Sequence, residues 1–425
     1  MRLYDTMTRQ KRELPGPPGP IRMYVCGPTV YARAHIGNAR PFVIGMWLRS
    51  WLVERGYDVT LVHNITDIND RIYDAAPGAS AALAERATAW YLRDTEDFGL
   101  GMPDHQPRAS ELIPQIVAMI EELVAAGYAY EVDGDVYFRV ARFPDYGRLS
   151  GQRPEQVEEQ EPNPRKEDPR DFALWKANKP GEDTWWESPW SRGRPGWHIE
   201  CSVMAEELLG PTFEIHGGGL DLVFPHHENE IAQSRALGHP FAQLWMHNGM
   251  LRFVGEKMSK SVGNIATIRE ALDRWGPENL LVFFLTAHWS KPIDYSDETL
   301  TAAEARAESL REVFRNASEP APIGEWDRLV TALEDDFNTP EALAIMHSWR
   351  DHELLRRGLQ LFGLGSLAKQ ESAPPEIVDL ATRRQEARSA GDFAEADRLR
   401  GAIEELGWTI RDVGEGFQLI PKRAA

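Results

Sequence analysis

The chain contains only two cysteines, and each lies beside residues that can bind a metal or a phosphate. Cys26 ends an apolar segment, and Cys201 closes the sequence GWHIEC. Further along, His226 and Glu230 are four residues apart, which places them on one face if that segment is helical. Two thiolates, one imidazole and one carboxylate suit tetrahedral Zn²⁺. The alternative is two buried apolar cysteines, which are common, and the long spacing matches no short zinc-finger pattern.

The tetrapeptide HIGN, residues 35–38, lies where an expected strand is followed by an expected helix. A helix N-terminus offers free N–H groups and a partial positive charge, so it suits a phosphate. His35 can donate hydrogen bonds to phosphate oxygens, and Gly37 lets the backbone come close. A capping histidine followed by a packing glycine would look the same, so the tetrapeptide alone is weak evidence.

A second candidate for phosphate binding is KMSKSVGN, residues 257–264. Lys257 and Lys260, with the neighbouring hydroxyls, would form a cationic loop. Such a loop can neutralise the charge that grows on a triphosphate during phosphoryl or nucleotidyl transfer. A solvated basic turn explains most pairs of lysines at this spacing. The pentapeptide KMSKS is much more specific, and its order after His35 favours the functional interpretation.

A glycine-rich run could support a flat ligand. Its members are His216, Gly217, Gly218, Gly219, Leu220 and Asp221. The glycines would let the backbone lie against the ligand, and Asp221 could accept hydrogen bonds from ribose hydroxyls. By itself the run predicts only a tight loop. Tryptophans 175, 185, 186 and 190 are expected in a satellite cluster beneath a long loop. Trp197, near Cys201, is expected to line a pocket.

These motifs need a scaffold, and the first 63 residues predict one. Ile21–Cys26 is typical of a buried strand. Apolar residues then recur at helical spacing from about His35 to Arg55, and Tyr57–His63 predicts a second strand. Strand, helix and strand within such a short stretch form a βαβ unit, which implies a parallel sheet and a right-handed crossover.

The rest of the chain alternates between helical and sheet-like patterns. We expect helices near 81–97 and 110–126, a hairpin in 128–140 around Asp133–Gly134, a flexible insertion at 154–171, strands at 212–215 and 244–247, helices from 296 to about 361, a linker at 369–375, a helix at 392–406 and a terminal hairpin formed by 408–411 and 417–421.

Composition limits the class of protein. The 425 residues suggest roughly three folding units, and two cysteines exclude a disulfide framework. No apolar stretch could span a bilayer, and the N-terminus has no secretory signal, so we expect a cytoplasmic protein.

With 47 Lys and Arg against 66 Asp and Glu, the net charge is −19, which argues against a protein that surrounds nucleic acid. Residues 375–425 carry 8 basic and 10 acidic side chains, so any RNA should bind through a restricted patch.

The sequence resembles the cysteinyl-tRNA synthetases, which are class I aminoacyl-tRNA synthetases. The similarity runs from near residue 1 to about 300 and continues more weakly to the C-terminus. It rests on segments that occur in the family's order: MYVCGPTVY (23–31), HIGN, DFALWK (171–176), GWHIECS (196–202), HGGGLDL (216–222), FPHHENEIAQS (224–234), KMSKSVGN, DDFNTPEA (335–342) and RSAGDFAEADRLR (388–400).

The resemblance implies an α/β fold and a set of domains. We expect a Rossmann-like parallel-sheet catalytic domain at 1–295 with an insertion at about 110–195, a helical bundle at 296–368, and a small C-terminal α+β module of the anticodon-binding type at 375–425. The implied reaction is ATP-dependent activation of L-cysteine to the adenylate, followed by transfer to tRNA(Cys).

The resemblance also implies roles for single residues. His35, Gly37 and Asn38 would be the "HIGH" signature, and Lys257 and Lys260 would act in the KMSKS loop, with Lys260 on the ATP phosphates together with Mg²⁺. The glycine-rich run, His216 to Asp221, would border the adenosine. Thr29 and Trp197 would contact the substrate cysteine. One Zn²⁺ would be held by Cys26, Cys201, His226 and Glu230.

Four positions depart from the family pattern. Asn38 replaces the last histidine of the signature but keeps an amide N–H, so we expect activity to survive. Asn69 stands where a second aspartate is frequent. Leu281 and Ser290 stand where the family often has arginine, and they could alter contacts next to the KMSKS loop or the tRNA stem.

Two other functions share part of this pattern. A ligase that joins cysteine to glucosaminyl-inositol in mycothiol synthesis has the same catalytic core but needs no anticodon module, whereas residues 375–422 predict a helix and a hairpin. A regulatory paralogue with a decayed site would not keep His35, Lys260 and both cysteines. We therefore expect a monomeric, non-membrane enzyme whose partners are tRNA(Cys), L-cysteine and ATP.

Overall fold

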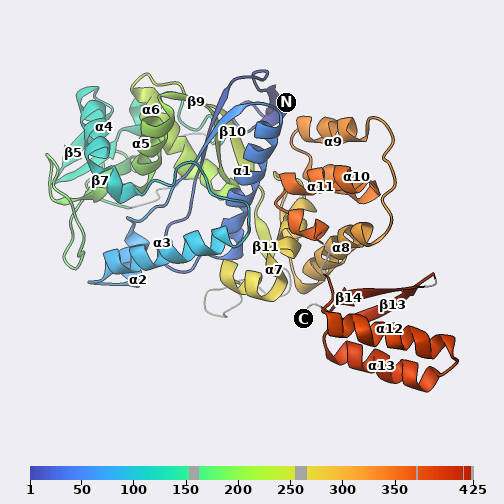
Figure 1. Cartoon of the computed structure of the whole chain (residues 1–425). Coiled ribbons are helices and arrows are strands. Elements are labelled where there is room, and N and C mark those ends of the chain that lie inside the picture. The colour runs from blue at the N-terminus through green and yellow to red at the C-terminus, as the bar shows by residue number, and fades with distance from the viewer. Residues whose placement is uncertain (153–161, 254–265, 370–371, 415, 423–425) are drawn as a thin grey trace. The chain divides into compact units, whose positions relative to one another are not determined.

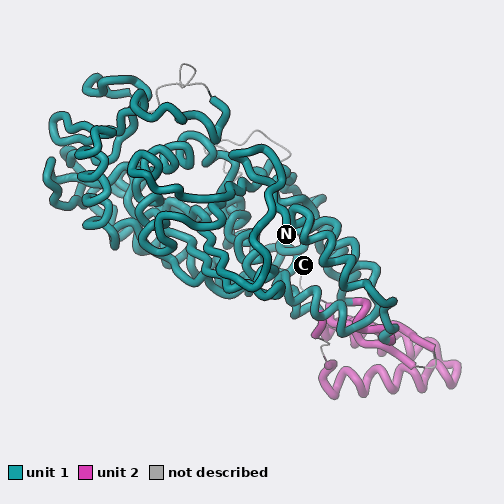
Figure 2. Tube along the Cα trace, turned by 90° about the horizontal axis from the view of Figure 1, so that it is seen from above, with its two compact units in different colours: residues 1–311, 318–367 teal, residues 312–317, 368–425 magenta. Residues whose placement is uncertain are grey.

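The computed structural model describes residues 1–152, 162–253, 266–369, 372–414 and 416–422. The chain forms two compact units (Figure 2). Unit 1 comprises residues 1–311 and 318–367, and unit 2 comprises residues 312–317 and 368–425. The predicted boundary between a catalytic domain and a helical bundle, at residues 295 and 296, lies inside unit 1 and stays a prediction.

A four-stranded parallel sheet forms the centre of unit 1 (Figure 1). Its strands, in spatial order, are β10 (Phe241–Asn248), β9 (Thr212–Gly219), β3 (Pro20–Val25) and β4 (Asp58–His63). Helix α1 (Ile36–Glu54) connects β3 to β4, which confirms the predicted βαβ unit. After β3 the chain forms β4 on one side of β3, and later it adds β9 and β10 on the other side. The gap between β3 and β9 is therefore a topological switch point, where open α/β sheets bind ligands.

Helix α1 is buried on most of its faces. Its apolar residues include Phe42, Trp47 and Trp51, each at most 2% exposed. A helix that is apolar all round must be covered on several sides. Here the sheet covers one side, and helices α7 (Ile268–Leu285) and α11 (His352–Leu361) contact it on others. The N-terminus of α1 is thereby fixed relative to the carboxyl ends of the strands.

An antiparallel sheet forms most of the insertion between the two halves of the parallel sheet. Its strands are β5 (Ala129–Val132), β6 (Asp135–Phe138), β7 (Phe172–Ala177) and β8 (Gly193–Pro195). Asp133 and Gly134 both have positive φ, 50° and 85°, as a two-residue hairpin turn requires, so the predicted hairpin is confirmed. The prediction for Trp175 was wrong: it lies in β7, is 0% exposed and belongs to a large buried cluster that includes residues of the parallel sheet.

Helices and short strands complete unit 1. They are β1 (Arg2–Asp5), β2 (Gln10–Glu13), α2 (Asp70–Ala75), α3 (Ser80–Glu96), α4 (Ile113–Ala125), α5 (Trp197–Leu209), α6 (Glu228–Ala236), β11 (Leu251–Phe253), β12 (Ile293–Tyr295), α8 (Asp297–Arg315, whose end belongs to unit 2), α9 (Glu325–Glu334) and α10 (Thr339–Ser348). The helical pattern predicted for residues 296–361 is confirmed. The β1–β2 hairpin was not predicted.

Unit 2 contains two helices and a hairpin around a small apolar core. These are α12 (Pro375–Ser389), α13 (Phe393–Glu405), β13 (Trp408–Val413) and β14 (Gly416–Pro421). Gly407 ends α13 with a positive φ of 82°, as predicted, and β13 pairs antiparallel with β14. Helix α12 was not predicted: it begins at Pro375, the last residue of the expected linker. In the described part of the whole chain, no helix is long and apolar enough to cross a bilayer.

Candidate active site and metal centre

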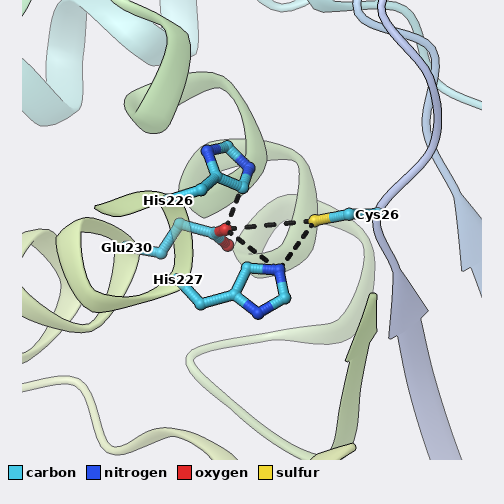
Figure 3. A group of neighbouring side chains, drawn as sticks. All are labelled: Cys26, His226, His227 and Glu230. Atoms are coloured by element: carbon cyan, nitrogen blue, oxygen red, sulfur yellow. Dashed lines mark hydrogen bonds and ion pairs between the residues drawn. The ribbon is translucent and has the colours of Figure 1, made fainter. Parts of the chain in front are cut away.

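Four buried side chains converge beside the switch point of the parallel sheet (Figure 3). Cys26 follows β3, His226 and His227 lie in the turn before α6, and Glu230 lies in the first turn of that helix. One ligand atom from each lies within 4.8 Å of the others. Nε2 of His226 is 3.1 Å from Oε1 of Glu230, which confirms that this i,i+4 pair shares a face. The donor set suits zinc.

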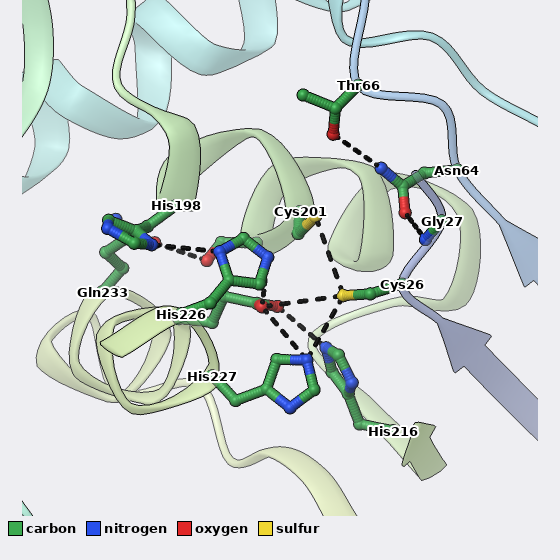
Figure 4. A network of polar contacts seen from close by, with 12 residues as sticks. Cys26, Gly27, Asn64, Thr66, His198, Cys201, His216, His226, His227 and Gln233 are labelled. Carbon is green, nitrogen blue, oxygen red and sulfur yellow. Dashed lines mark hydrogen bonds and ion pairs between the residues drawn. The ribbon is translucent and has the colours of Figure 1, made fainter. Parts of the chain in front are cut away.

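Cys201, the second predicted thiol ligand, reaches the same place from α5. Its Sγ lies 3.9 Å from Sγ of Cys26, and both cysteines are buried (Figure 4). Cys201 therefore lies beside Cys26, but the group whose ligand atoms all lie within 4.8 Å of one another contains His227 in its place, so Cys201 stays a predicted ligand. His227, which the sequence analysis missed, is a fifth candidate. The i,i+4 rule selected His226, whereas the irregular turn before α6 directs both histidines inward.

His227 has partners on both ring nitrogens. Nδ1 of His227 is 2.8 Å from Nε2 of His247, and Nδ1 of His247 is 2.7 Å from the Thr6 hydroxyl. Nε2 of His227 is 3.3 Å from Cys26 Sγ. If Cys26 is a thiolate, one direction satisfies all three bonds: Thr6 donates to His247, His247 to His227, and His227 to the sulfur. His227 then supports the thiolate without needing to bind the metal itself.

Burial controls the charge of this cluster. It raises the pKa of Glu230 to about 8 and lowers the pKa of His226 to about 3, because both side chains are removed from water. It also raises the pKa of the Cys26 thiol well above its usual range. A divalent cation among these atoms would reverse the effect on the anionic ligands, since its charge stabilises carboxylate and thiolate. The residues therefore fit a resident metal ion.

The glycine-rich run was predicted as a tight loop, but residues 216–219 form the carboxyl end of β9, and only Leu220 and Asp221 lie in the turn that follows. The side chain of His216 is 0% exposed, and its Nε2 lies 2.8 Å from Oε2 of Glu230. This side chain thus orients a candidate ligand and is not available to a nucleotide. Gly219 is half-buried, and Leu220 and Asp221 are exposed, so the last three residues are the accessible members of the run.

A pocket of about 300 Å³ opens next to the metal cluster. It is lined by Thr29 and Trp197, the two residues predicted to contact substrate cysteine. The Trp197 indole stacks on the His226 ring, with centroids 4.3 Å apart and planes at 19°. The pocket therefore adjoins the metal cluster through Trp197, although none of the candidate ligands is among its described lining residues.

The HIGN tetrapeptide occupies the N-terminus of α1, as predicted. His35 is the residue preceding the helix and is exposed. A Cβ on Gly37 would lie 2.9 Å from the His35 imidazole, so glycine allows the ring to fold over the first turn. The main chain of residues 34–36 also bonds to residues 266–268: Ile36 N–H donates to Ala266 O at 3.0 Å, and Ile268 N–H to Ala34 O at 2.9 Å. Lys257 and Lys260 lie outside the described residues.

Gly27, directly after Cys26, cannot carry a side chain without moving the backbone. Its N–H donates to Asn64 Oδ1 at 2.8 Å, and a Cβ would lie 1.7 Å from the Asn64 carbonyl oxygen. Gly27→Ala is expected to lower the free energy of unfolding by about 3 kcal/mol, measured by urea denaturation. Gly16→Ala is the matched control, because its Cβ would meet nothing within 4 Å. Equal effects of the two substitutions would contradict the close packing at Gly27.

The structure explains Asn69, which departs from the family pattern. It precedes α2, and its Oδ1 accepts the Arg71 N–H at 3.1 Å. Asn and Asp cap helices equally well, so Asn69→Asp is expected to change the free energy of unfolding by less than about 0.5 kcal/mol, whereas Asn69→Ala should cost about 1 kcal/mol. Chemical denaturation measures both. A large effect of Asn69→Asp on stability would refute this capping role.

The two departures from arginine have local explanations as well. Leu281 is 0% exposed within α7, so its side chain packs in the protein core. An effect of this leucine on contacts next to the KMSKS loop or the tRNA stem stays a prediction. Ser290 is half-buried, and its hydroxyl lies 2.9 Å from Nδ1 of His288. Neither position introduces a buried charge.

Comparison with known proteins agrees with this geometry. Residues 14–305 match the family described as tRNA synthetases class I (C) catalytic domain, and residues 371–418 match the Cysteinyl-tRNA ligase anticodon binding domain. Methionyl-tRNA synthetase of Mycobacterium tuberculosis, solved with methionyl-adenylate, shares the fold with a TM-score of 0.58 at 17% identity, covering 83% of this chain and 86% of its own. The fold and the site thus define a class I aminoacyl-tRNA synthetase.

Relatives that match over almost their full length identify the family within the class I aminoacyl-tRNA synthetases. The chain is 41% identical to the Cysteine--tRNA ligase of Caldicellulosiruptor saccharolyticus, covering 99% of both chains. It is 44% identical to that of Alkalilimnicola ehrlichii, covering 98% of both. The chain belongs to the cysteine–tRNA ligase family, and the family assignment predicted from the motifs is confirmed.

Proposed function

We propose that the protein activates L-cysteine with ATP and Mg²⁺ to cysteinyl-adenylate and then transfers the cysteinyl group to tRNA(Cys). The observation that carries this proposal is the buried cluster of two thiols, imidazoles and a carboxylate beside the pocket lined by Thr29 and Trp197. A pocket next to a thiophilic metal centre suits a small substrate that carries a thiol.

We assign zinc to Cys26, Cys201, His226 and Glu230. Thiolates favour Zn²⁺ over the harder divalent ions, and His227 has another role in the bond chain from Thr6. When bound, zinc supplies a Lewis acid that takes substrate sulfur as thiolate, which the hydroxyl of serine cannot match. Such a contact gives more discrimination than the about 1–3 kcal/mol available from one methylene. Trp197 closes one side of the pocket and holds His226 in place by stacking.

Adenylation requires the substrate carboxylate to attack the α-phosphate of ATP while pyrophosphate leaves. In this proposal, the exposed His35 and the N-terminal N–H groups of α1 stabilise the charge that develops on the phosphates. Lys260 and Mg²⁺ would neutralise the leaving pyrophosphate. Gly219 and Asp221, at the carboxyl end of β9, would border the adenosine.

In this proposal, unit 2 binds the tRNA that accepts the cysteinyl group. Its match to an anticodon-binding family favours tRNA over the small amine acceptor of the mycothiol ligase, which needs no such module. The net charge of −19 predicts modest affinity for unrelated RNA, since non-specific binding depends on phosphate neutralisation. A cytoplasmic location and a monomeric state stay predictions.

The proposal is tested by two successive assays on the zinc-loaded chain. We expect cysteine-dependent ATP–pyrophosphate exchange, followed by charging of tRNA(Cys). Exchange without charging would overturn the RNA step and favour a small amine acceptor. The absence of exchange in protein that contains one zinc per chain would indicate a paralogue with a decayed site.

A further inference from the structure

Arg40 is a buried cation in α1, five residues after His35. Its side chain is 1% exposed, and the guanidinium bonds to two backbone carbonyls. Nη1 donates to the carbonyl oxygen of Gly249, and Nη2 donates to that of His288 at 3.1 Å. Nε has no partner among the described residues. Burial lowers the pKa of Arg40 to about 10, so the side chain stays charged at neutral pH.

The other buried arginines of the described residues show how unusual this arrangement is. Arg194 pairs with Asp70 and Glu182, and Arg311 with Glu278 and Glu308. In unit 2, Arg384 pairs with Asp412. Arg40 has no ion pair with a carboxylate within the described ranges. Burying a cation without a counter-ion is costly, so a function that uses the charge is expected here.

The two carbonyl partners belong to chain segments that flank the carboxyl end of the parallel sheet. Gly249 directly follows β10, and its N–H donates to Trp289 O at 2.9 Å. A Cβ on Gly249 would lie 2.2 Å from the carbonyl carbon of Lys291, so these two segments pack backbone to backbone. Arg40 therefore ties the end of β10 and residues 288–291 to α1 with a single side chain.

The same end of α1 is tied to the chain by backbone bonds. Residues 34–36 bond to residues 266–268, which precede and begin α7. The N-terminus of α1 is thus held from two directions, by main chain at residues 266–268 and by Arg40 at residues 249 and 288. A shift of the end of β10 relative to His35 would break the contacts of Arg40.

We propose that Arg40 is a positioning residue for the nucleotide, holding the carboxyl end of β10 against the N-terminus of α1. This inference rests on the proposed function, because it assumes that ATP phosphates bind at that N-terminus. The bidentate bridge fixes the distance between the two elements. The uncompensated charge also adds to the positive potential of the helix N-terminus, and the bound polyphosphate supplies the counter-charge that the described protein residues lack.

The test compares Arg40→Lys and Arg40→Met with wild type in cysteine-dependent ATP–pyrophosphate exchange. Both variants are expected to raise the KM for ATP by about tenfold or more, because each loses a charge-assisted bridge between the two elements. The KM for cysteine is expected to stay within about twofold, because Arg40 does not line the Thr29–Trp197 pocket. Arg40→Lys keeps the charge and provides a readout if Arg40→Met does not fold.

Arg311→Met is the matched control, since it removes another buried guanidinium from unit 1. It is expected to lower the melting temperature without changing the KM for ATP. If the Arg40 variants lose stability but keep the wild-type KM for ATP, or if the KM for cysteine rises equally, Arg40 is structural and the inference is overturned. A wild-type chain without exchange activity would refute the proposed function itself, so the two failures are distinguishable.

Discussion

Cys201→Ser is expected to leave the protein without stoichiometric zinc, whereas His227→Gln should retain it. Structural zinc sites gain about 10–16 kcal/mol from four ligands, so the loss of one thiolate should weaken metal binding by about 1000-fold. Cysteine-dependent exchange should fall in parallel, because the substrate thiolate loses its partner. Loss of a residue that only supports a ligand weakens metal binding by about 10–100-fold. The His227 variant should therefore still bind zinc at micromolar concentration.

The metal content of the purified variants, measured by elemental analysis, shows whether Cys201 or His227 is the fourth ligand beside Cys26, His226 and Glu230. Ser202→Ala is the neighbouring control: the Ser202 hydroxyl is buried and bonds to Gln233, which is not a candidate ligand. It should keep one zinc per chain. If His227→Gln loses zinc and Cys201→Ser keeps it, the ligands are instead Cys26, His226, His227 and Glu230, the four whose ligand atoms lie within 4.8 Å of one another.

His35→Ala is expected to reduce kcat for ATP–pyrophosphate exchange by about 100- to 1000-fold. A donor aimed at charge that develops in the transition state typically contributes this much. The KM for cysteine should stay near wild type, and the variant should keep its zinc, because His35 lies outside the metal cluster. Steady-state exchange kinetics over a range of cysteine and ATP concentrations measures both constants.

His239→Ala provides a control for the removal of an imidazole. His239 contacts Glu206 at 2.7 Å and has no place in the proposed mechanism, so kcat should not change. An equal decrease in both variants would mean that the loss reflects stability. A His35 variant with wild-type kcat would contradict the proposed role of His35 in stabilising the phosphates.

The sequence predicted the elements that depend on local pattern. The β3–α1–β4 unit follows from helical spacing in 36–54 between two apolar runs, and the β5–β6 hairpin follows from Asp133–Gly134. The predicted ligands meet because each comes from a motif at the end of a strand or in the first turns of a helix. The resemblance to a known family implied the set of four, and the zinc assignment itself stays a prediction.

Features that depend on distant partners were not predictable in the same way. Trp175 looked like part of a loop cluster because its strand partners, β6 and β8, are separated from it in sequence by poorly patterned residues. His227 became a cluster member through the irregular turn before α6, which no periodicity describes. Leu281 is apolar at a position associated with arginine, and its buried side chain lies next to Gly363, a residue 82 positions away in the sequence.

The wide separation of the candidate ligands in the sequence has a consequence for biosynthesis. Cys26 and Glu230 are 204 residues apart, and Cys26 and Cys201 are 175 apart. At a translation rate of about 5–20 residues per second, Cys26 leaves the ribosome roughly 10–40 seconds before Glu230 is made. Until Cys201 is made, 175 residues after Cys26, the Cys26 thiol has neither of these partners. A metal centre built from these residues could be completed only after Glu230 has been synthesised, so metal loading would be a late event in the synthesis of the chain.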